Sequence, residues 1–186
     1  MRKLIVMLLL VLAASSVMAA LGWFAEYILV SPNSGADVWY YIGDGTEPIG
    51  SQFDSADLGT FSEGLTLEFG ADIRYWSDSQ DRDGGAFYWV IDGGTSPNEV
   101  IWTHTYLGGN DFLGTEPTTH DVASGLGVGA HTVSIWAKSW GTGQGDSWLN
   151  NGGANYNATF TIIPEPTTMI LVGLGVAGLL VYRRRG

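Results

Sequence analysis

Residues 65–76 read LTLEFGADIRYW, and apolar side chains at every second position predict a β-strand with one face against a core. The same alternation recurs in shorter runs at residues 23–30, 38–42, 87–91, 100–106, 131–138 and 156–162. Segments rich in Gly, Asn and Asp separate these runs, and no window keeps a helical period. Short alternating strands between turns predict an all-β fold, namely an antiparallel β-sandwich.

The composition of the 186-residue chain excludes several classes of protein. The chain has no cysteine, so it has no disulfide, no thiolate metal site and no cysteine nucleophile. Its formal net charge of -11 repels phosphate backbones, so we expect no nucleic-acid partner. With 45% hydrophobic residues the chain can bury a core, and its length favours one domain.

Residues 1–19, MRKLIVMLLLVLAASSVMA, have the layout of a secretory signal peptide. Arg2 and Lys3 form a basic start, an apolar run follows, and Val17 and Ala19 fit the small-residue rule for cleavage after Ala19. The apolar run is too short for a permanent membrane span. We therefore expect an N-terminal signal helix that directs export, with an uncleaved anchor as the alternative.

Residues 164–186 contain three segments in a fixed order. Pro164, Glu165 and Pro166 come first, the uncharged residues 167–182 follow, and Arg183, Arg184 and Arg185 stand near the end. A hydrophobic run before a basic cluster predicts a single transmembrane helix whose arginines lie on the cytoplasmic side. At about 1.5 Å per residue the run spans about 24 Å, which is short of the ~30 Å hydrocarbon core. The tail is therefore expected to be a thin membrane anchor.

This tail resembles the PEP-CTERM sorting signal of exported bacterial proteins. The resemblance implies that an exosortase, a membrane-embedded, Cys-dependent transpeptidase-like enzyme, removes the tail near Pro164, Glu165 and Pro166. It also implies that Arg183–Arg185 hold the tail in register until removal. The implied destination is the cell envelope, the cell surface or the extracellular matrix of an organism that makes exopolysaccharide, after transient anchoring in the inner membrane. An ordinary single-span anchor is the alternative.

Residues 20–163 form the expected ectodomain, and their charge differs from that of the whole chain. They hold 18 acidic residues against Arg74, Arg82 and Lys138, which gives a formal net charge of -15. The stretches FYWVIDGG (87–94), VASGLGVGAHTVSIWAKSWG (122–141) and ATFTI (158–162) resemble immunoglobulin-like or fibronectin-type-III-like modules. This resemblance implies that Trp89 is a core tryptophan. The beginning of the ectodomain departs from the pattern, so an additional hairpin or a jelly-roll topology stays open.

An acidic loop is the candidate metal site. Asp78, Asp81 and Asp83 precede the turn-forming pair Gly84-Gly85, and clustered carboxylates are ligands that Ca²⁺ prefers. In a sandwich this loop lies at the same end as the loop expected over residues 140–153, from which Asp146 would complete the shell. A solvated acidic loop without metal is the alternative.

Aromatic residues on the solvent side of a strand are the candidate carbohydrate-binding site. Because Val133, Ile135 and Ala137 form the core side of their strand, Trp136 and Trp140 point outward, and Tyr88 is expected beside them on the neighbouring strand. Exposed aromatic rings of this kind stack on sugar rings. The alternative is that other segments cover these rings.

The three histidines form no metal or triad motif. His104 alternates with Trp102 and Tyr106 and is expected to be a packed strand residue, whereas His120 is expected on a loop. The sequence is therefore interpreted as an exported, non-catalytic structural or adhesive module associated with exopolysaccharide. A calcium-stabilised, self-assembling surface protein and a glycan-active hydrolase are the alternatives.

Overall fold

The computed structural model describes residues 21–43, 51–78, 82–142 and 145–165. Four of the predictions lie outside these residues: the signal peptide with Ala19, the transmembrane helix 167–182, Pro166 with Arg183–Arg185, and the candidate ligand Asp81. Within the described ranges, no helix has the length and apolar character needed to cross a bilayer.

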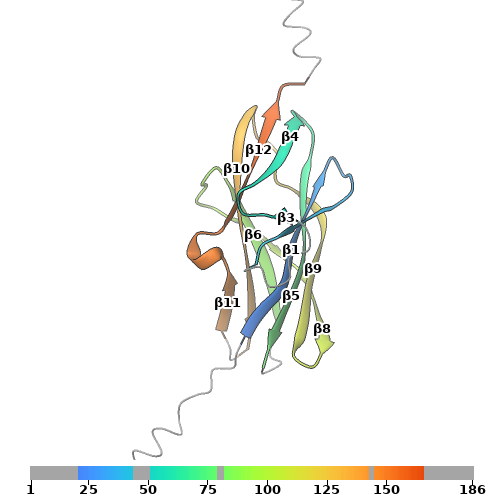
Figure 1. The fold of residues 1–186 in the computed structure, drawn as a ribbon, viewed down its shortest axis with the longest axis vertical. Coiled ribbons are helices and arrows are strands. Elements are labelled where there is room, and N and C mark those ends of the chain that lie inside the picture. Colours follow the sequence, from blue (N-terminus) through green and yellow to red (C-terminus); the bar gives the residue numbers. More distant parts are fainter. Residues whose placement is uncertain (1–20, 44–50, 79–81, 143–144, 166–186) are drawn as a thin grey trace, which may run out of the picture.

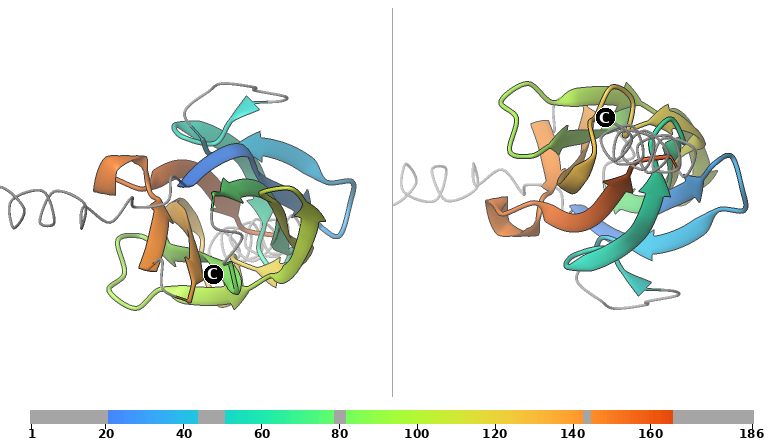
Figure 2. Two further views of the ribbon diagram at one scale, coloured as in Figure 1. Left: turned by 90° about the horizontal axis from the view of Figure 1, so that it is seen from below. Right: turned by 90° about the horizontal axis from the view of Figure 1, so that it is seen from above.

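The described residues form two β-sheets that face each other (Figure 1). In order across the sheet, the first contains β3 (Ser51–Gln52), β2 (Val38–Tyr41), β1 (Leu21–Pro32), β5 (Leu67–Ser77), β9 (Asp111–Asp121) and β8 (Thr103–Gly108). The second contains β4 (Ala56–Ser62), β12 (Tyr156–Ile163), β10 (Gly129–Gly141), β6 (Gly84–Ile91) and β7 (Asn98–Ile101), and β11 (Gly145–Leu149) also pairs with β10. The end-on views show these strands arranged around the long axis of the body (Figure 2).

The core lies between the sheets and follows the predicted alternation. Along β5 every second side chain is buried: Leu67, Phe69, Ala71, Ile73 and Tyr75. The core side of β10 is also buried and consists of Val133, Ile135 and Ala137. Trp89 of β6 pairs with Ile135 in register and belongs to the same buried cluster. The prediction of an all-β sandwich with a core tryptophan is confirmed.

The strand order is consistent with an immunoglobulin-like ectodomain. Strands β5, β9 and β8 in one sheet, and β12, β10 and β6 in the other, follow the two sheet orders of that fold. The β1–β2 hairpin extends the first sheet beyond β5, which is the additional hairpin that the sequence left open. The prediction of purely antiparallel pairing is wrong in two places, because β4 runs parallel to β12 and β3 runs parallel to β2. The sheets are therefore mixed.

One predicted strand is in fact two. The run 100–106 is divided at Trp102, with β7 in the second sheet and β8 in the first. The Trp102 side chain is buried at this crossover, and its ring lies so close to Gly85 and Gly114 that a Cβ atom at either glycine would overlap it. Trp102 lies between the two strands and is buried in the core. For this reason the alternation of apolar and polar residues in the sequence runs from β7 into β8 without a break.

Four further strands, β3, β4, β9 and β11, were not predicted, and the last two matter for the site. Strand β9 contains Gly114, Pro117 and several polar residues that mask its alternation, and it pairs with both β5 and β8. His120 therefore lies on a strand and not on a loop, and its Nε2 is 3.0 Å from Oε1 of Glu116. Strand β11 lies inside the expected loop 140–153 and forms a hairpin with β10.

Candidate functional site

The outer side of the second sheet carries a group of five side chains that we call the aromatic face: Tyr88 of β6, Trp136, Lys138 and Trp140 of β10, and Trp148 of β11. Register places them together, because Trp136 pairs with Tyr88 and Lys138 pairs with Trp148. Their parity along β10 is opposite to that of the buried residues Val133, Ile135 and Ala137. The predicted outward direction of Trp136 and Trp140 is thus seen in the structure.

Tyr88 is the buried member of the aromatic face and packs against Trp136. Its ring stacks on Trp136 with centroids 5.6 Å apart and an interplanar angle of 8°. The Tyr88 side chain is only 8% exposed, and its hydroxyl donates a hydrogen bond of 2.6 Å to Oε1 of Glu99. Burial and this bond raise the pKa of Tyr88, so the phenol stays protonated. Tyr88 therefore fixes the orientation of Trp136 and offers little surface of its own.

The more accessible part of the face is a lysine between two indoles. The Nζ of Lys138 lies 5.3 Å from the ring centroid of Trp140 and 5.1 Å from that of Trp148, within cation–π range. Trp148 is 48% exposed. The same ammonium is 3.4 Å from Oδ2 of Asp146. The face thus offers indole surfaces, one cation and one carboxylate side by side.

The indole of Trp140 lies directly over Gly84 of β6, which has no side chain. A Cβ atom at Gly84, the register partner of Trp140, would lie 3.1–3.5 Å from three atoms of its indole. Because Gly84 has no side chain, the ring packs against the backbone of β6, which restricts its rotation.

Two residues on or beside this face, Trp148 and Glu99, were not predicted from the sequence. Trp148 lies in the segment expected to be a loop, and only the β10–β11 register places it opposite Lys138. Glu99 lies on β7, opposite Tyr88. Two carboxylates, Glu99 and Asp146, therefore border the aromatic residues.

The acidic loop and the β10–β11 turn do lie together, but their carboxylates have protein partners. Oδ2 of Asp83 accepts hydrogen bonds from the backbone N–H (2.7 Å) and the hydroxyl (2.8 Å) of Thr142. The guanidinium of the buried Arg82 donates to the carbonyl of Gly145 at 3.1 Å. Burial lowers the pKa of Arg82, and Asp146 and Asp83 oppose this shift.

Asp78 is exposed next to this region, and Asp81 lies outside the described residues. Across the described part of the chain, no group of three or more acidic or histidine side chains is placed to hold a metal ion. A guanidinium already lies near Asp83 and Asp146, so the structure gives the predicted calcium site no support beyond the proximity of the two loops.

His104 is a packed strand residue, as expected. The hydroxyl of Tyr75 lies 2.6 Å from Nδ1 of His104, and the imidazole stacks on Phe112 with centroids 5.3 Å apart. Burial lowers the pKa of His104 and raises the pKa of Tyr75 to about 12. Both groups are therefore neutral at physiological pH, and they pack together beside Phe112.

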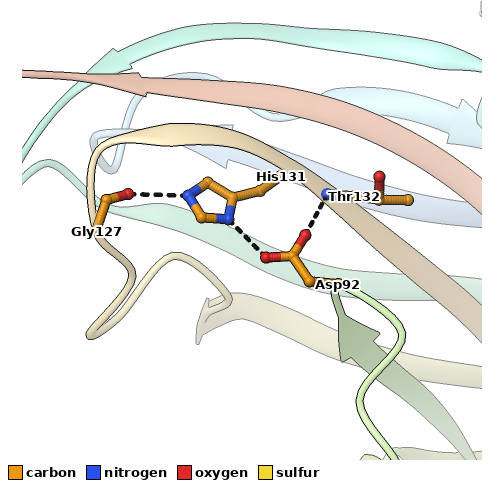
Figure 3. A network of polar contacts seen from close by, with 4 residues as sticks. All are labelled: Asp92, Gly127, His131 and Thr132. Carbon is orange, nitrogen blue, oxygen red and sulfur yellow. Dashed lines mark hydrogen bonds and ion pairs between the residues drawn. The ribbon is translucent and has the colours of Figure 1, made fainter.

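A polar network surrounds His131 at the end of the body where β10 begins, opposite the end that contains His104 (Figure 3). The imidazole Nδ1 lies 2.8 Å from Oδ2 of Asp92, and Nε2 lies 2.9 Å from the carbonyl oxygen of Gly127. Both partners are acceptors, so both ring nitrogens donate when the imidazole is protonated. The second Asp92 oxygen accepts the backbone N–H of Thr132 at 2.8 Å.

The predicted sorting motif leaves the body at this same end. β12 ends at Ile163, and Pro164 and Glu165 follow without an intervening linker. The carbonyl oxygen of Ile163 accepts a hydrogen bond of 2.8 Å from the N–H of Glu63, directly after β4. The described part of the motif is therefore continuous with a core strand.

Comparison with known protein families identifies this motif. Residues 163–185 match the family model described as the PEP-CTERM protein-sorting motif. None of the curated proteins matches the chain. The motif supports processing by an exosortase and export to the cell envelope or surface. The described part of the chain is thus an all-β, sandwich-like body that continues directly into a PEP-CTERM sorting motif.

Proposed function

We propose that the ectodomain is a non-catalytic adhesive module that binds exopolysaccharide at the cell surface or in the extracellular matrix. The observation that carries this proposal is the aromatic face, where Trp140 and Trp148 stand on either side of Lys138. Sugar rings present apolar C–H faces that stack on indoles, while their hydroxyls need hydrogen-bond donors and acceptors at the edge. Lys138 and Asp146 supply one of each.

The dimensions and charge of the surface narrow the ligand. Trp136 and Trp140 are four residues apart on one strand, about 13 Å at ~3.3 Å per residue, which suits contacts with more than one sugar of a chain. The ectodomain carries 18 acidic residues against three basic ones, so it repels anionic polymers over long range. The favoured ligand is therefore a neutral polysaccharide that lies along the sheet.

A matched pair of tryptophan variants tests this function. Trp140→Ala combined with Trp148→Ala should weaken binding to exopolysaccharide purified from the producing organism by about tenfold or more, since central aromatic residues dominate binding energy. Trp39→Ala is the control, because Trp39 is 43% exposed but lies on β2 in the other sheet. Equal binding by the double variant and the control, with both folded by circular dichroism, would refute the proposal.

Processing has its own test. Mass spectrometry of the mature protein should show a C-terminus near Pro164, without Arg183–Arg185. Recovery of the intact basic tail at the final location would show instead that the tail is a permanent anchor.

A further inference from the structure

The matched sorting motif begins inside the folded body. Ile163 is both the last residue of β12 and the first residue of the match. Pro164 and Glu165 follow at once, so no linker separates the sheet from the Pro-Glu-Pro sequence. Three residues span at most about 10 Å when fully extended, which keeps the folded body next to the start of the apolar segment.

The end of β12 is held on both sides. On one side it pairs in parallel with β4, with Ile162 opposite Phe61 and Ile163 opposite Ser62. On the other side, Gly129 of β10 pairs with Ile162. Ile162 is 4% exposed and belongs to the core, whereas Ile163 is 42% exposed. The N–H of Glu63 also donates a hydrogen bond to the carbonyl oxygen of Ile163, the residue directly before Pro164.

An enzyme that cuts a peptide chain binds the substrate as an extended segment and forms hydrogen bonds with the backbone N–H and C=O groups of that segment. In the folded protein, Ile162 is paired with both β4 and β10, Ile163 is paired with β4, and the Ile163 carbonyl accepts the N–H of Glu63, so this stretch of backbone is not free for another partner. The end of the sandwich also lies directly before Pro164, so the folded body limits the access of a membrane-embedded enzyme to this segment. The segment before Pro164 therefore fits such an enzyme only after it leaves the sheet.

We propose that the end of β12 separates from β4 before the tail is removed, so that pairing of Ile163 with Ser62 and Glu63 controls the rate of processing. This inference rests on the proposed exosortase processing and concerns the conformational step that precedes it. Cleavage of a transiently opened segment follows the population of the open form when opening is fast. Release of Ile163 frees a side chain that is already exposed, whereas release of Ile162 uncovers a core side chain, so the opening is expected to stop between them.

A disulfide lock tests this proposal, and the chain suits it because it has no cysteine of its own. Ser62→Cys with Ile163→Cys would join β4 to the end of β12. Asp57→Cys with Thr159→Cys is the matched control, because these residues pair on the same two strands but away from the tail. Thiol titration confirms each bridge in the full-length chain, and loss of a C-terminal tag in cells with the exosortase measures processing.

We expect the Ser62–Ile163 bridge to slow processing by about tenfold or more, with recovery on reduction, because the bridge removes the open form. The control bridge should leave the rate unchanged. Processing of the bridged Ser62–Ile163 variant at the wild-type rate would overturn the inference. If the wild-type chain keeps its tail in the same cells, the proposed exosortase processing itself fails, which separates the two hypotheses.

A linker variant tests the same step without a bridge. About six Gly and Ser residues inserted between Ile163 and Pro164 would place the motif about 13 Å from the sheet on average. The motif could then be bound without opening β12, so processing should become faster than in the wild-type chain. A linker variant that is processed no faster would overturn the proposal.

Discussion

A histidine lies at each end of the sandwich, but aromatic packing surrounds one imidazole and hydrogen bonds to acceptors surround the other. At the end formed by β8, His104 is packed against Phe112 and Tyr75, and burial lowers its pKa. At the end from which the tail leaves, His131 donates to Asp92 and Gly127, and the bond to Asp92 raises its pKa. The first end is closed by aromatic packing and the second by charge, so different substitutions should open them.

Removal of Trp102 should have the largest effect, because it is the buried ring around which the β8 end is packed. Trp102→Ala should lower the free energy of unfolding by about 3–5 kcal/mol in urea titrations. Ile101→Ala is the control, since Ile101 is the exposed neighbour, and it should change stability by about 0.5 kcal/mol or less. Similar losses for both variants would show that packing does not close this end.

Glycine substitutions compare the two ends directly. A Cβ atom at Gly85 would overlap the Trp102 ring, so Gly85→Ala should cost about 1–3 kcal/mol of stability. A Cβ atom at Gly127, in the tail-end network, would meet no atom within 4 Å. Gly127→Ala keeps the carbonyl that His131 uses and should leave the melting temperature almost unchanged. An equal loss at both positions would mean that the tail end is packed as tightly as the other.

The sequence predicts those strands that bury one face in the core and expose the other to solvent. β5 and β10 alternate cleanly because each turns one side to the core, and the same parity predicted that Trp136 and Trp140 point outward. β9 escaped prediction because Gly114 and Pro117 interrupt its pattern.

The remaining features depend on how the strands pair. β4 and β12 are about 100 residues apart in sequence, and no local pattern indicates that they pair in parallel. The positions of Trp148 and Glu99 depend instead on the register of two hairpins, β10–β11 and β6–β7, which their turn sequences did not reveal. The sequence therefore predicted Tyr88, Trp136 and Trp140 of the candidate site, but not Trp148 or Glu99.

Removal of the charge at the tail end should have a moderate effect that depends on pH. Asp92→Asn should cost about 1 kcal/mol near pH 6, a value that allows for the half-exposed carboxylate. Because the pKa of His131 is raised, its contribution is complete below its ordinary pKa of about 6.5 and is lost as the pH rises through the folded value. The difference between wild type and variant, measured by urea unfolding, should therefore be smaller at pH 8 than at pH 6.

Asp92 sets the lower limit of this window. Partial burial would raise the pKa of Asp92, but the hydrogen bonds from His131 and Thr132 outweigh it, and the net shift is downward. The contribution of this carboxylate is therefore present above its ordinary pKa of about 3.9 and is lost as the pH falls through the folded value. A difference between wild type and Asp92→Asn that persists unchanged at pH 8 would show that charge does not hold this end.

His104 should give the smallest effect, with the opposite sign. Because burial lowers its pKa, the stability linked to its neutral form is complete above about pH 6.5 and is lost as the pH falls through the folded value. Relative to wild type, His104→Gln should therefore be more destabilising at pH 8 than at pH 5.5, whereas His131→Gln should be more destabilising at pH 5.5. The double variant should lose both trends in urea titrations. If the two single variants shared one pH trend, the two ends would not differ in how they are closed.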